Sequence, residues 1–335
     1  MKVISLRSPG GLDNLELRDT EGPGEPKAGE MRVRIHASSL NFHDYLVANG
    51  SIRTADGRIP MSDGAGVVEA VGEGVEEFAV GDRVVSTFFP DWVDGRARVG
   101  DFRNTPGDGI DGYAREQVLA APRYFTRAPE GYSHQEAATL TTAGLTAWRA
   151  LVVNGGLRAG ETVLTLGTGG VSIFALQFAR AMGASVISTS SSDEKIEKLK
   201  ALGADHTINY KSEPEWGKRV LELTDGVGVD HVIEVGGPGT LPQSIQAVRI
   251  GGHISLIGVL TGGAGEVPTM KLMARQARLQ GLIVGSRADQ QDMIRAIETI
   301  DLHPVIDCSF ALAEIADAFR HQEAGRHFGK ICLEF

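Results

Sequence analysis

The chain has 335 residues, and its 43 acidic residues against 33 basic ones give a formal net charge of −10. An acidic surface disfavours binding to nucleic-acid phosphates or anionic membranes, and no apolar run approaches the roughly 20 residues of a membrane-spanning helix. Hydrophobic residues make up 42% of the chain, and its length suggests two domains. The N-terminus has no secretory apolar region, and two cysteines, Cys308 and Cys332, cannot build a disulfide framework, so we expect a cytoplasmic location.

The first third of the sequence is rich in short strand candidates. Runs of Val, Ile and Leu bounded by Gly, Pro and Asp clusters occur at 2–6, 14–18, 31–37, 66–71 and 82–88. Strands at this spacing predict a compact, barrel-like β domain. Residues 91–112 contain few apolar side chains, and we expect a long surface loop there, either functional or an ordinary insertion.

Strand and helix patterns alternate after residue 122. Apolar strand candidates lie at 162–166, 185–189, 206–209, 231–235, 253–257 and 279–284. Helical patterns at 170–182, 195–202, 215–223, 241–249 and 270–275 separate most of them. This alternation predicts a doubly wound parallel sheet with right-handed crossovers. The tail adds helices at 292–299 and 313–323 and a final strand at 330–334.

A glycine turn follows the first of these strands directly. Residues 167–172 read Gly-Thr-Gly-Gly-Val-Ser, and a helix pattern begins within them. The first glycine permits a tight turn and the second lets the backbone approach a pyrophosphate at the helix N-terminus. Ser172 replaces the third glycine of the fingerprint. The strand–turn–helix context predicts dinucleotide binding, against the alternative of a purely structural turn.

The end of the second strand bears on which dinucleotide binds. Thr189 is followed by three serines at 190–192, and no acid stands at the tip to bind a ribose 2′-hydroxyl. The hydroxyls and Lys195 favour a 2′-phosphate and therefore NADP(H), with NAD(H) less favoured. Asp193 and Glu194 weaken this case, and the alternative is that the serines only cap the next helix beside a solvated lysine.

Several further motifs occur in a recognisable order, at 37–44, 63–75, 81–84, 138–147, 201–205, 208–210 and 327–330. With the glycine turn, they make the chain resemble the medium-chain dehydrogenase/reductase superfamily, specifically its zinc-free quinone-oxidoreductase-like branch. The resemblance implies an α/β fold in which a GroES-like β-barrel catalytic domain, 1–121 and 286–335, joins a doubly wound Rossmann dinucleotide-binding domain, 122–285. It places the active site in the cleft between them.

The resemblance also implies a site without zinc. The positions that match the zinc ligands of related alcohol dehydrogenases hold Asn41, Ser62 and Ala143, none of them a good ligand, and the four-cysteine structural lobe is missing. A joint site of His36, His43 and Asp63 is the alternative. Since zinc would stabilise developing charge on a carbonyl oxygen, its loss favours acceptors that spread the charge themselves, such as quinones and enones.

By the same resemblance, Asn41 lines the active site and binds the substrate oxygen. His43 is the expected proton donor, with solvent as the alternative, and Asp44 orients this network or serves the structure. The pocket wall is expected to draw on Phe88, Phe89, Trp92 and Tyr113.

The resemblance assigns the cofactor contacts to several segments of the chain. Thr142, Val284 and Gly285 are expected near the nicotinamide, and Lys330 either near the adenosine phosphate or paired with surface acids. The pyrophosphate turn comprises Gly167, Gly169, Gly170, Val171 and Ser172. The adenosine-phosphate pocket comprises Ser190, Ser191, Lys195 and Tyr210, and strand ends at Val235, Gly236, Ile257, Gly258 and Val259 flank the dinucleotide.

These observations predict an NADPH-dependent reductase of quinones or activated alkenes, acting on a small-molecule carbonyl or quinone substrate without a metal. One alternative is a zinc-free alcohol or aldehyde dehydrogenase. Another is a non-catalytic NADPH-binding sensor or structural protein. The apolar strand at 279–284 permits a homodimer formed across a two-fold axis.

Overall fold

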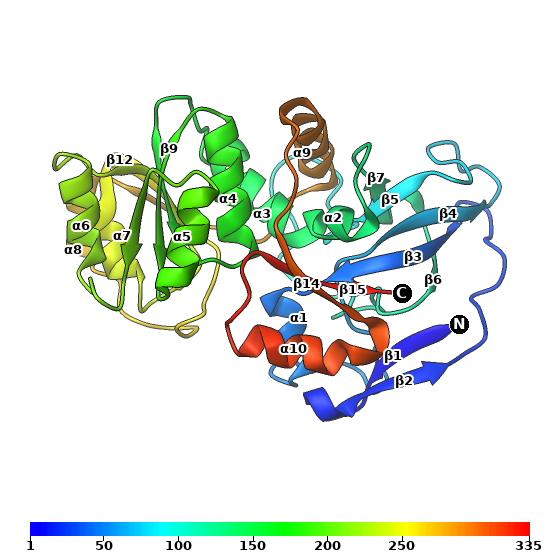
Figure 1. Cartoon of the computed structure of the whole chain (residues 1–335). Helices are drawn as coiled ribbons and strands as arrows, with labels where there is room; N and C mark the ends of the chain where they lie inside the picture. Colours follow the sequence, from blue (N-terminus) through cyan, green and yellow to red (C-terminus); the bar gives the residue numbers. More distant parts are fainter. The chain divides into compact units, whose positions relative to one another are not determined.

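The structure is a computed structural model that describes residues 1–335 and divides into two compact units (Figure 1). The first unit comprises Met1–Leu145 and Val284–Phe335, and the second comprises Thr146–Ile283. This division lies later than the expected boundary at residue 122. Strand β7 (Phe125–Arg127) pairs with β5 (Arg83–Ser86), and Ala138 and Thr142 form hydrogen bonds with Ser39 and Asp63, so these residues belong to the first unit.

The first unit is built on a seven-stranded sheet with the order β14-β15-β3-β4-β5-β7, and β6 also pairs with β3. The remaining strands of this sheet are β3 (Met31–Ser39), β4 (Ala65–Val71), β6 (Gln117–Ala120), β14 (Ile306–Ala311) and β15 (Lys330–Glu334). A separate hairpin joins β1 (Lys2–Leu6) and β2 (Leu15–Asp19). The helices are α1 (Phe42–Ala48), α2 (His134–Ala138), α9 (Arg287–Ile300) and α10 (Ile315–Glu323). The β-rich character expected for the GroES-like domain is confirmed.

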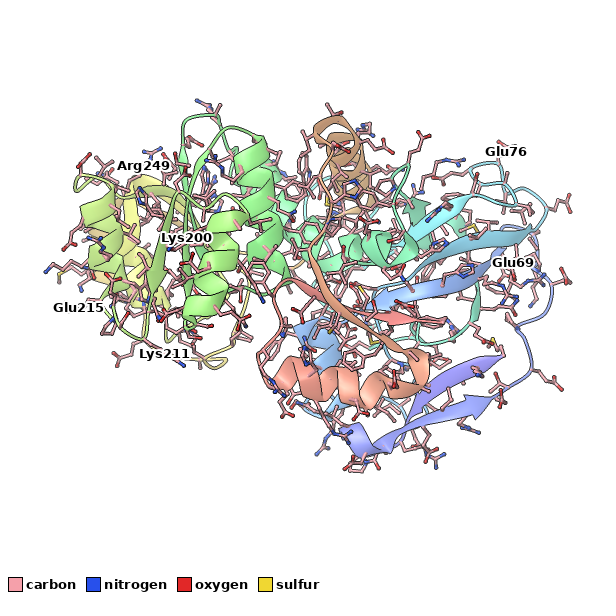
Figure 2. The ribbon with its side chains drawn as sticks, viewed as in Figure 1. Glu69, Glu76, Lys200, Lys211, Glu215 and Arg249 are labelled. Carbon is pink, nitrogen blue, oxygen red and sulfur yellow. The ribbon has the colours of Figure 1, made fainter.

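Strand β3 shows why this sequence forms a sheet. Met31, Val33 and Ile35 are at most 1% exposed and pack in the core, because alternate residues of a strand point to one face. Arg32 and Arg34 point the other way. Both guanidinium groups lie within 3.4 Å of the carboxylate of Glu69 on β4, which Figure 2 labels on this surface.

The second unit is a six-stranded parallel sheet with the order β10-β9-β8-β11-β12-β13. This is the doubly wound order predicted from the alternating pattern. The strands are β8 (Thr162–Leu166), β9 (Ser185–Ser190), β10 (His206–Asn209), β11 (Val229–Glu234), β12 (Val248–Leu256) and β13 (Arg278–Gly281). The helices are α3 (Leu145–Trp148, at the boundary), α4 (Gly170–Ala181), α5 (Asp193–Ala201), α6 (Trp216–Leu223), α7 (Leu241–Ala247) and α8 (Thr269–Arg275).

The core of the second unit is formed by the strands and by the inner faces of the helices. Ile187 on β9 and Val232 on β11 pack with Val220 and Ile245 from α6 and α7, and each is at most 1% exposed. Charged residues occupy the outer faces. Lys200 on α5, labelled in Figure 2, lies 2.7 Å from Glu197 one turn earlier.

Some elements differ from the sequence-based expectations. Strand β13 ends at Gly281 and not at residue 284, and Val284 itself adopts a positive φ of 45° that lies outside the strand region. The short elements α1, α2, β6, β7 and β14 were not predicted. The irregular segment 91–112 is confirmed, since no helix or strand lies between β5 and β6. None of the helices combines the length and the apolar character needed to cross a membrane.

Candidate functional site

The residues expected to hold a dinucleotide gather at one edge of the parallel sheet. They follow the carboxyl ends of five strands, the edge where open α/β sheets bind ligands. The assignments are Gly167, Gly169, Gly170, Val171 and Ser172 after β8, Ser190, Ser191 and Lys195 at the end of β9, Tyr210 after β10, Val235 and Gly236 after β11, and Ile257, Gly258 and Val259 after β12.

The glycine turn has the geometry that a pyrophosphate requires. Gly167 adopts φ +71°, a conformation that glycine reaches without strain. Helix α4 begins at Gly170 and no side chain caps it, while a Cβ added to Gly169 would meet nothing within 4 Å. The helix N-terminus therefore faces open space. Ser172 turns its hydroxyl inward, where Oγ donates to the Leu166 carbonyl at 2.6 Å, so only its backbone is available to a ligand.

The serines after β9 have mixed roles. The hydroxyl of Ser192 accepts from the Lys195 backbone N–H at 3.4 Å, so this serine caps α5 as the alternative interpretation expected. The buried Ser190 hydroxyl accepts from the Ser192 N–H, and the Ser190 carbonyl accepts from the N–H of Tyr210 at 3.0 Å. Asp193 accepts a hydrogen bond from Asn209 at 2.6 Å, which engages this acid with the neighbouring strand.

A buried glutamate organises the loop after β11. Glu234 is fully buried, and its Oε1 accepts from the N–H groups of Gly236 and Gly237 at 2.8 and 3.0 Å and from the Thr240 hydroxyl. A Cβ on Gly236 would collide with Thr240, and one on Gly258 would collide with the Val235 carbonyl. These glycines are therefore required by packing. Sequence reasoning missed Glu234, although an acid at the end of an apolar strand was a visible signal.

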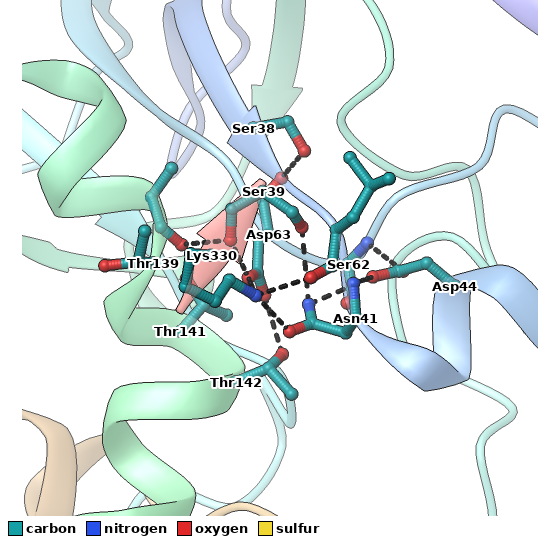
Figure 3. Close-up of polar contacts among 12 residues, drawn as sticks. Ser38, Ser39, Asn41, Asp44, Ser62, Asp63, Thr139, Thr141, Thr142 and Lys330 are labelled. Atoms are coloured by element: carbon teal, nitrogen blue, oxygen red, sulfur yellow. Dashed lines mark hydrogen bonds and ion pairs between the residues drawn. The ribbon is translucent and has the colours of Figure 1, made fainter. Parts of the chain in front are cut away.

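The first unit contains a dense cluster of buried polar groups, which Figure 3 shows. Its members come from the end of β3, the start of α1, the loop before β4, the π-helical turn η3 (Leu140–Gly144) and the start of β15. They include Ser38, Ser39, Asn41, Asp44, Ser62, Asp63, Thr141, Thr142 and Lys330. Val284 and Gly285 lie immediately before α9, and a Cβ added to Gly285 would meet the side chain of Leu145, the residue that follows η3.

Lys330 is the buried cation of this cluster. It is 3% exposed, and Nζ donates to the Leu40 carbonyl and to Oδ1 of Asn41, both at 2.6 Å. The expectation that Lys330 pairs with surface acids or serves an adenosine phosphate is wrong, because its ammonium is enclosed by partners of the first unit. Burial lowers the pKa of Lys330, and the Asp63 carboxylate, 3.8 Å away, opposes that shift.

The orientation of the Asn41 carboxamide follows from these partners. An ammonium can only donate and a carboxylate can only accept, so Oδ1 must face Lys330 and Nδ2 must face Asp44. Nδ2 lies 3.0 Å from Oδ2 of Asp44 and 3.4 Å from the Ser39 carbonyl. The carboxamide is therefore fixed at both ends, with the contact to the Ser39 carbonyl the longer of the two that Nδ2 makes.

Asp44 serves both the network and the helix. Its carboxylate accepts from the Asn41 backbone N–H at 3.1 Å, which caps α1, and from the Ser62 N–H at 2.8 Å. The two roles weighed for this residue are thus filled by the same carboxylate.

Asp63 and Thr142 form a second hydroxyl–carboxylate contact in the cluster. Thr142 Oγ1 donates to Oδ1 of Asp63 at 2.6 Å, and Ser39 Oγ donates to Oδ2 at 2.6 Å. Burial raises the pKa of Asp63 to about 6, against the lowering effects of Lys330 and the two hydroxyls.

His43 points toward the 91–112 loop. Its Nε2 lies 3.3 Å from Oδ2 of Asp108, and its ring stacks on Phe102 at 4.9 Å and meets the edge of Phe88. Phe89 and Trp92 join this aromatic group, and Phe89 lines a pocket together with residues of the 91–112 loop. The expectation for Tyr113 is wrong: it is 1% exposed and packs against Phe125 in the core.

The donor set does not suit zinc. Ala143 has no ligand atom, and the Asn41 oxygen already accepts from an ammonium whose charge would repel a metal cation. The alternative trio is not gathered either. His36 stacks on His134 at 4.6 Å, His43 pairs with Asp108, and Asp63 binds hydroxyls.

Comparisons with known proteins agree with this architecture. Residues 27–130 match the family model "Alcohol dehydrogenase GroES-like domain", and residues 170–300 match "Zinc-binding dehydrogenase". A zinc-type alcohol dehydrogenase-like protein of Schizosaccharomyces pombe is 41% identical, over 97% of this chain and 96% of its own length. A quinone oxidoreductase of Pseudomonas aeruginosa is 34% identical, over 99% of both chains.

Solved structures are also similar over the whole chain. A putative alcohol dehydrogenase from Sinorhizobium meliloti has a TM-score of 0.93 and 42% identity, covering 100% of this chain and 98% of its own. An NAD-dependent alcohol dehydrogenase has a TM-score of 0.90 and 34% identity, covering 100% of each chain. A mycobacterial protein complexed with NADPH has a TM-score of 0.83 and 27% identity, again covering 100% of each.

Proposed function

Because the chain belongs to the medium-chain dehydrogenase/reductase superfamily and is an oxidoreductase of that family, we propose that it reduces quinones or activated alkenes with NADPH, by hydride transfer without a metal. One observation carries the metal-free part of this proposal. The Lys330 ammonium lies 2.6 Å from the Asn41 oxygen, at a position where zinc-dependent relatives are expected to place a ligand.

The second unit supplies the nucleotide site of this proposal. The uncapped N-terminus of α4 and the open space beside Gly169 fit a pyrophosphate. When bound, the reduced nicotinamide supplies the hydride. Lys195 and Ser191 after β9 and Tyr210 after β10 are proposed to bind the 2′-phosphate, and no acid at the tip of β9 would repel it.

The choice of substrate follows from the proposed lack of a Lewis acid. Hydride addition to a simple ketone leaves a localised alkoxide, which zinc would stabilise by several kcal/mol. Hydride addition to a quinone or an enone leaves a delocalised anion that needs less stabilisation. Phe102 is the partly exposed ring of the aromatic group, and with Phe88 and Phe89 packed against it this ring offers an apolar surface suited to such conjugated substrates.

The proposal is tested by following NADPH oxidation with matched panels of quinones, enones and simple aldehydes, before and after dialysis against a chelator. We expect turnover of the conjugated acceptors, little turnover of the aldehydes and no effect of the chelator. Stoichiometric zinc in the purified protein, with activity lost on chelation, would overturn the metal-free assignment.

An alcohol or aldehyde dehydrogenase is the second candidate, because relatives named alcohol dehydrogenase cover this chain almost completely. Alcohol-dependent reduction of NADP⁺ without quinone or enone activity would select it. Tight NADPH binding with no turnover of any panel would instead indicate the non-catalytic sensor or structural role.

A homodimer is also proposed. Strand β13 is the edge of the second unit's sheet, and its outer backbone groups are available to pair with a second copy. Sedimentation at several protein concentrations tests this assembly.

A further inference from the structure

The Asp63 carboxyl is a buried titratable group for which hydride transfer alone has no use. It has no exposed surface, yet its Oδ1 accepts a hydrogen bond from Thr142, whose side chain is half-buried. The remaining acceptor, Oδ2, is held by the fully buried Ser39. Of the three residues in this contact, Thr142 is the one with exposed surface, so it links the buried Asp63 carboxyl to the surface of the first unit.

The shape of the helix brings Thr142 to this position. Residues Leu140–Gly144 form a π-helical turn, whose extra residue changes the direction of the following side chains. As a result, two adjacent hydroxyls both point into the unit. Thr141 Oγ1 donates to the Ser86 carbonyl at 3.0 Å, while Thr142 Oγ1 donates to Asp63. Single-turn insertions of this kind are frequent at functional sites.

The Lys330 ammonium offsets the charge of the Asp63 carboxylate without forming a short hydrogen bond to it. The Lys330 ammonium lies 3.8 Å from Oδ2, and its short bonds go to Leu40 and Asn41 instead. The other titratable groups that face this pair are Asp44 from α1 and the Cys332 thiol from β15. With a pKa of about 6, set mainly by burial, Asp63 can hold or release a proton near neutral pH.

The protonation state of Asp63 decides what Thr142 can do. A carboxylate can only accept, so Thr142 then gives its single proton inward and presents lone pairs outward. A neutral carboxyl can donate to the Thr142 oxygen, and the hydroxyl proton is then free to point outward. The pair can therefore pass one proton across the surface of the site in either direction.

Building on the proposed reduction, we infer that Thr142 is a catalytic residue and that Thr142 and Asp63 together are the proton-transfer pair of the reaction. NADPH is oxidised as its hydride forms a C–H bond on the acceptor. The acceptor's anionic oxygen then takes the Thr142 proton, and the Asp63 carboxyl proton restores the hydroxyl. Water reaching Thr142 returns a proton to Asp63 after product leaves. Lys330 is a positioning residue, because its ammonium offsets the free-energy cost of burying the ionised Asp63 carboxylate between turnovers.

The first test compares Thr142→Val, Thr142→Ser and the control Thr141→Val, whose hydroxyl lies next to Thr142 but does not contact Asp63. General acid–base catalysis contributes about 10²–10⁴-fold, so Thr142→Val should lower kcat by at least about 10²-fold while KM changes little. Thr142→Ser should restore most of the rate, and Thr141→Val should keep it. Turnover of Thr142→Val within about two-fold of the wild type would overturn the inference.

The second test is the pH profile. Reduction needs the protonated Asp63, so kcat should fall as pH rises through about 6. Asp63→Asn leaves Lys330 as an unbalanced buried cation and can fail to fold, so the double variant Asp63→Asn/Lys330→Met, which removes both charges, is measured beside it. Loss of the pH break in the folded variant supports the pair, and its persistence contradicts it.

The two proposals fail differently. If the wild type reduces no quinone or enone but oxidises alcohols, the proposed function fails, while the pair is tested in reverse. Its kcat for oxidation should then rise as pH rises through about 6, and Thr142→Val should remove that dependence. If the wild type reduces conjugated acceptors and Thr142→Val does so equally well, only the inference fails. Activity in neither direction overturns both.

Discussion

The ammonium of Lys330 and the carboxamide oxygen of Asn41 lie 2.6 Å apart, although the two residues are 289 positions apart in the chain. Because Asp44 holds the other end of the same carboxamide, the amide has one orientation and the cation has one place. The C-terminal strand thus takes part directly in organising the start of α1.

Removing the Lys330 charge should destabilise the fold. Lys330→Met leaves the Asp63 carboxylate buried without its cation, and breaking a buried pair in this way costs about 3–5 kcal/mol. Denaturant unfolding at neutral pH measures this loss. Adding Asp63→Asn to the variant should recover part of it, and a double variant as unstable as Lys330→Met would show that the charge pair is not the cause.

Gly169→Ala should weaken dinucleotide binding without weakening the fold. The added Cβ meets no protein atom within 4 Å, so the unfolding midpoint should stay within experimental error. The same methyl group would occupy the space proposed for the pyrophosphate, and the dissociation constants of NADPH and NADH should rise together. Gly263→Ala, also in open space in the second unit, is the matched control and should bind both dinucleotides like the wild type. Dissociation constants that are the same for Gly169→Ala and Gly263→Ala would contradict the proposed pyrophosphate site.

Lys195→Ala should discriminate between the two cofactors. A hydrogen bond to a charged group contributes about 1.5–3 kcal/mol, so KM for NADPH should rise by roughly 10- to 100-fold while KM for NADH changes little. Steady-state kinetics with each cofactor measure the difference. Lys200→Ala, on the outer part of the same helix and paired with Glu197, serves as the control. Equal effects of Lys195→Ala on both cofactors would remove the 2′-phosphate assignment.

His134→Gln should reduce the acid sensitivity of the first unit. Burial, with Arg83 and His36 contributing, lowers the pKa of His134 from 6.5 to about 4. A histidine whose pKa is lowered by folding contributes stability above its unfolded pKa, and that contribution is lost as pH falls from 6.5 toward 4. The unfolding free energy of the variant should therefore fall less than that of the wild type over this range. Parallel curves would show that His134 titrates normally.

His43 provides the contrast to Thr142. Its Nε2 faces Asp108 in the 91–112 loop, so His43→Gln should change KM through the position of that loop and leave the pH profile of kcat intact. Stopped-flow and steady-state measurements across pH decide the matter. Loss of the pH break in this variant would return the proton-donor role to His43.

The second unit was predictable because its signals are local. The turn at Gly167 and Gly169 follows β8 directly, and alternation of apolar runs and helix patterns is enough to order a parallel sheet. The roles of the serines at the end of β9 are harder to predict from the sequence. Whether Ser190 and Ser192 face a ligand or cap a helix depends on their side-chain rotamers.

The polar cluster of the first unit was predictable only in part. The family resemblance identifies the segment of Asn41 and Asp44 as part of the site. It does not predict the environment of Lys330, because the hydrogen-bond partners of this lysine lie at the other end of the sequence. The sequence suggests Asp63 only as a ligand of the alternative metal site with His36 and His43. Its link to Thr142 depends on a π-helical turn, and helical periodicity does not reveal an inserted residue.

The buried Lys330 ammonium beside Asn41 also limits how a metal site could be engineered into this fold. Under the proposed metal-free assignment, converting this fold to zinc chemistry would require metal ligands at positions 41, 62 and 143, together with a neutral residue at 330. A ligand introduced at position 41 alone would lie beside the Lys330 ammonium, and a neutral residue at 330 alone would leave the Asp63 carboxylate without its counter-ion. A library that varies these positions singly would therefore miss the metalloenzyme, and the four must be randomised as a block.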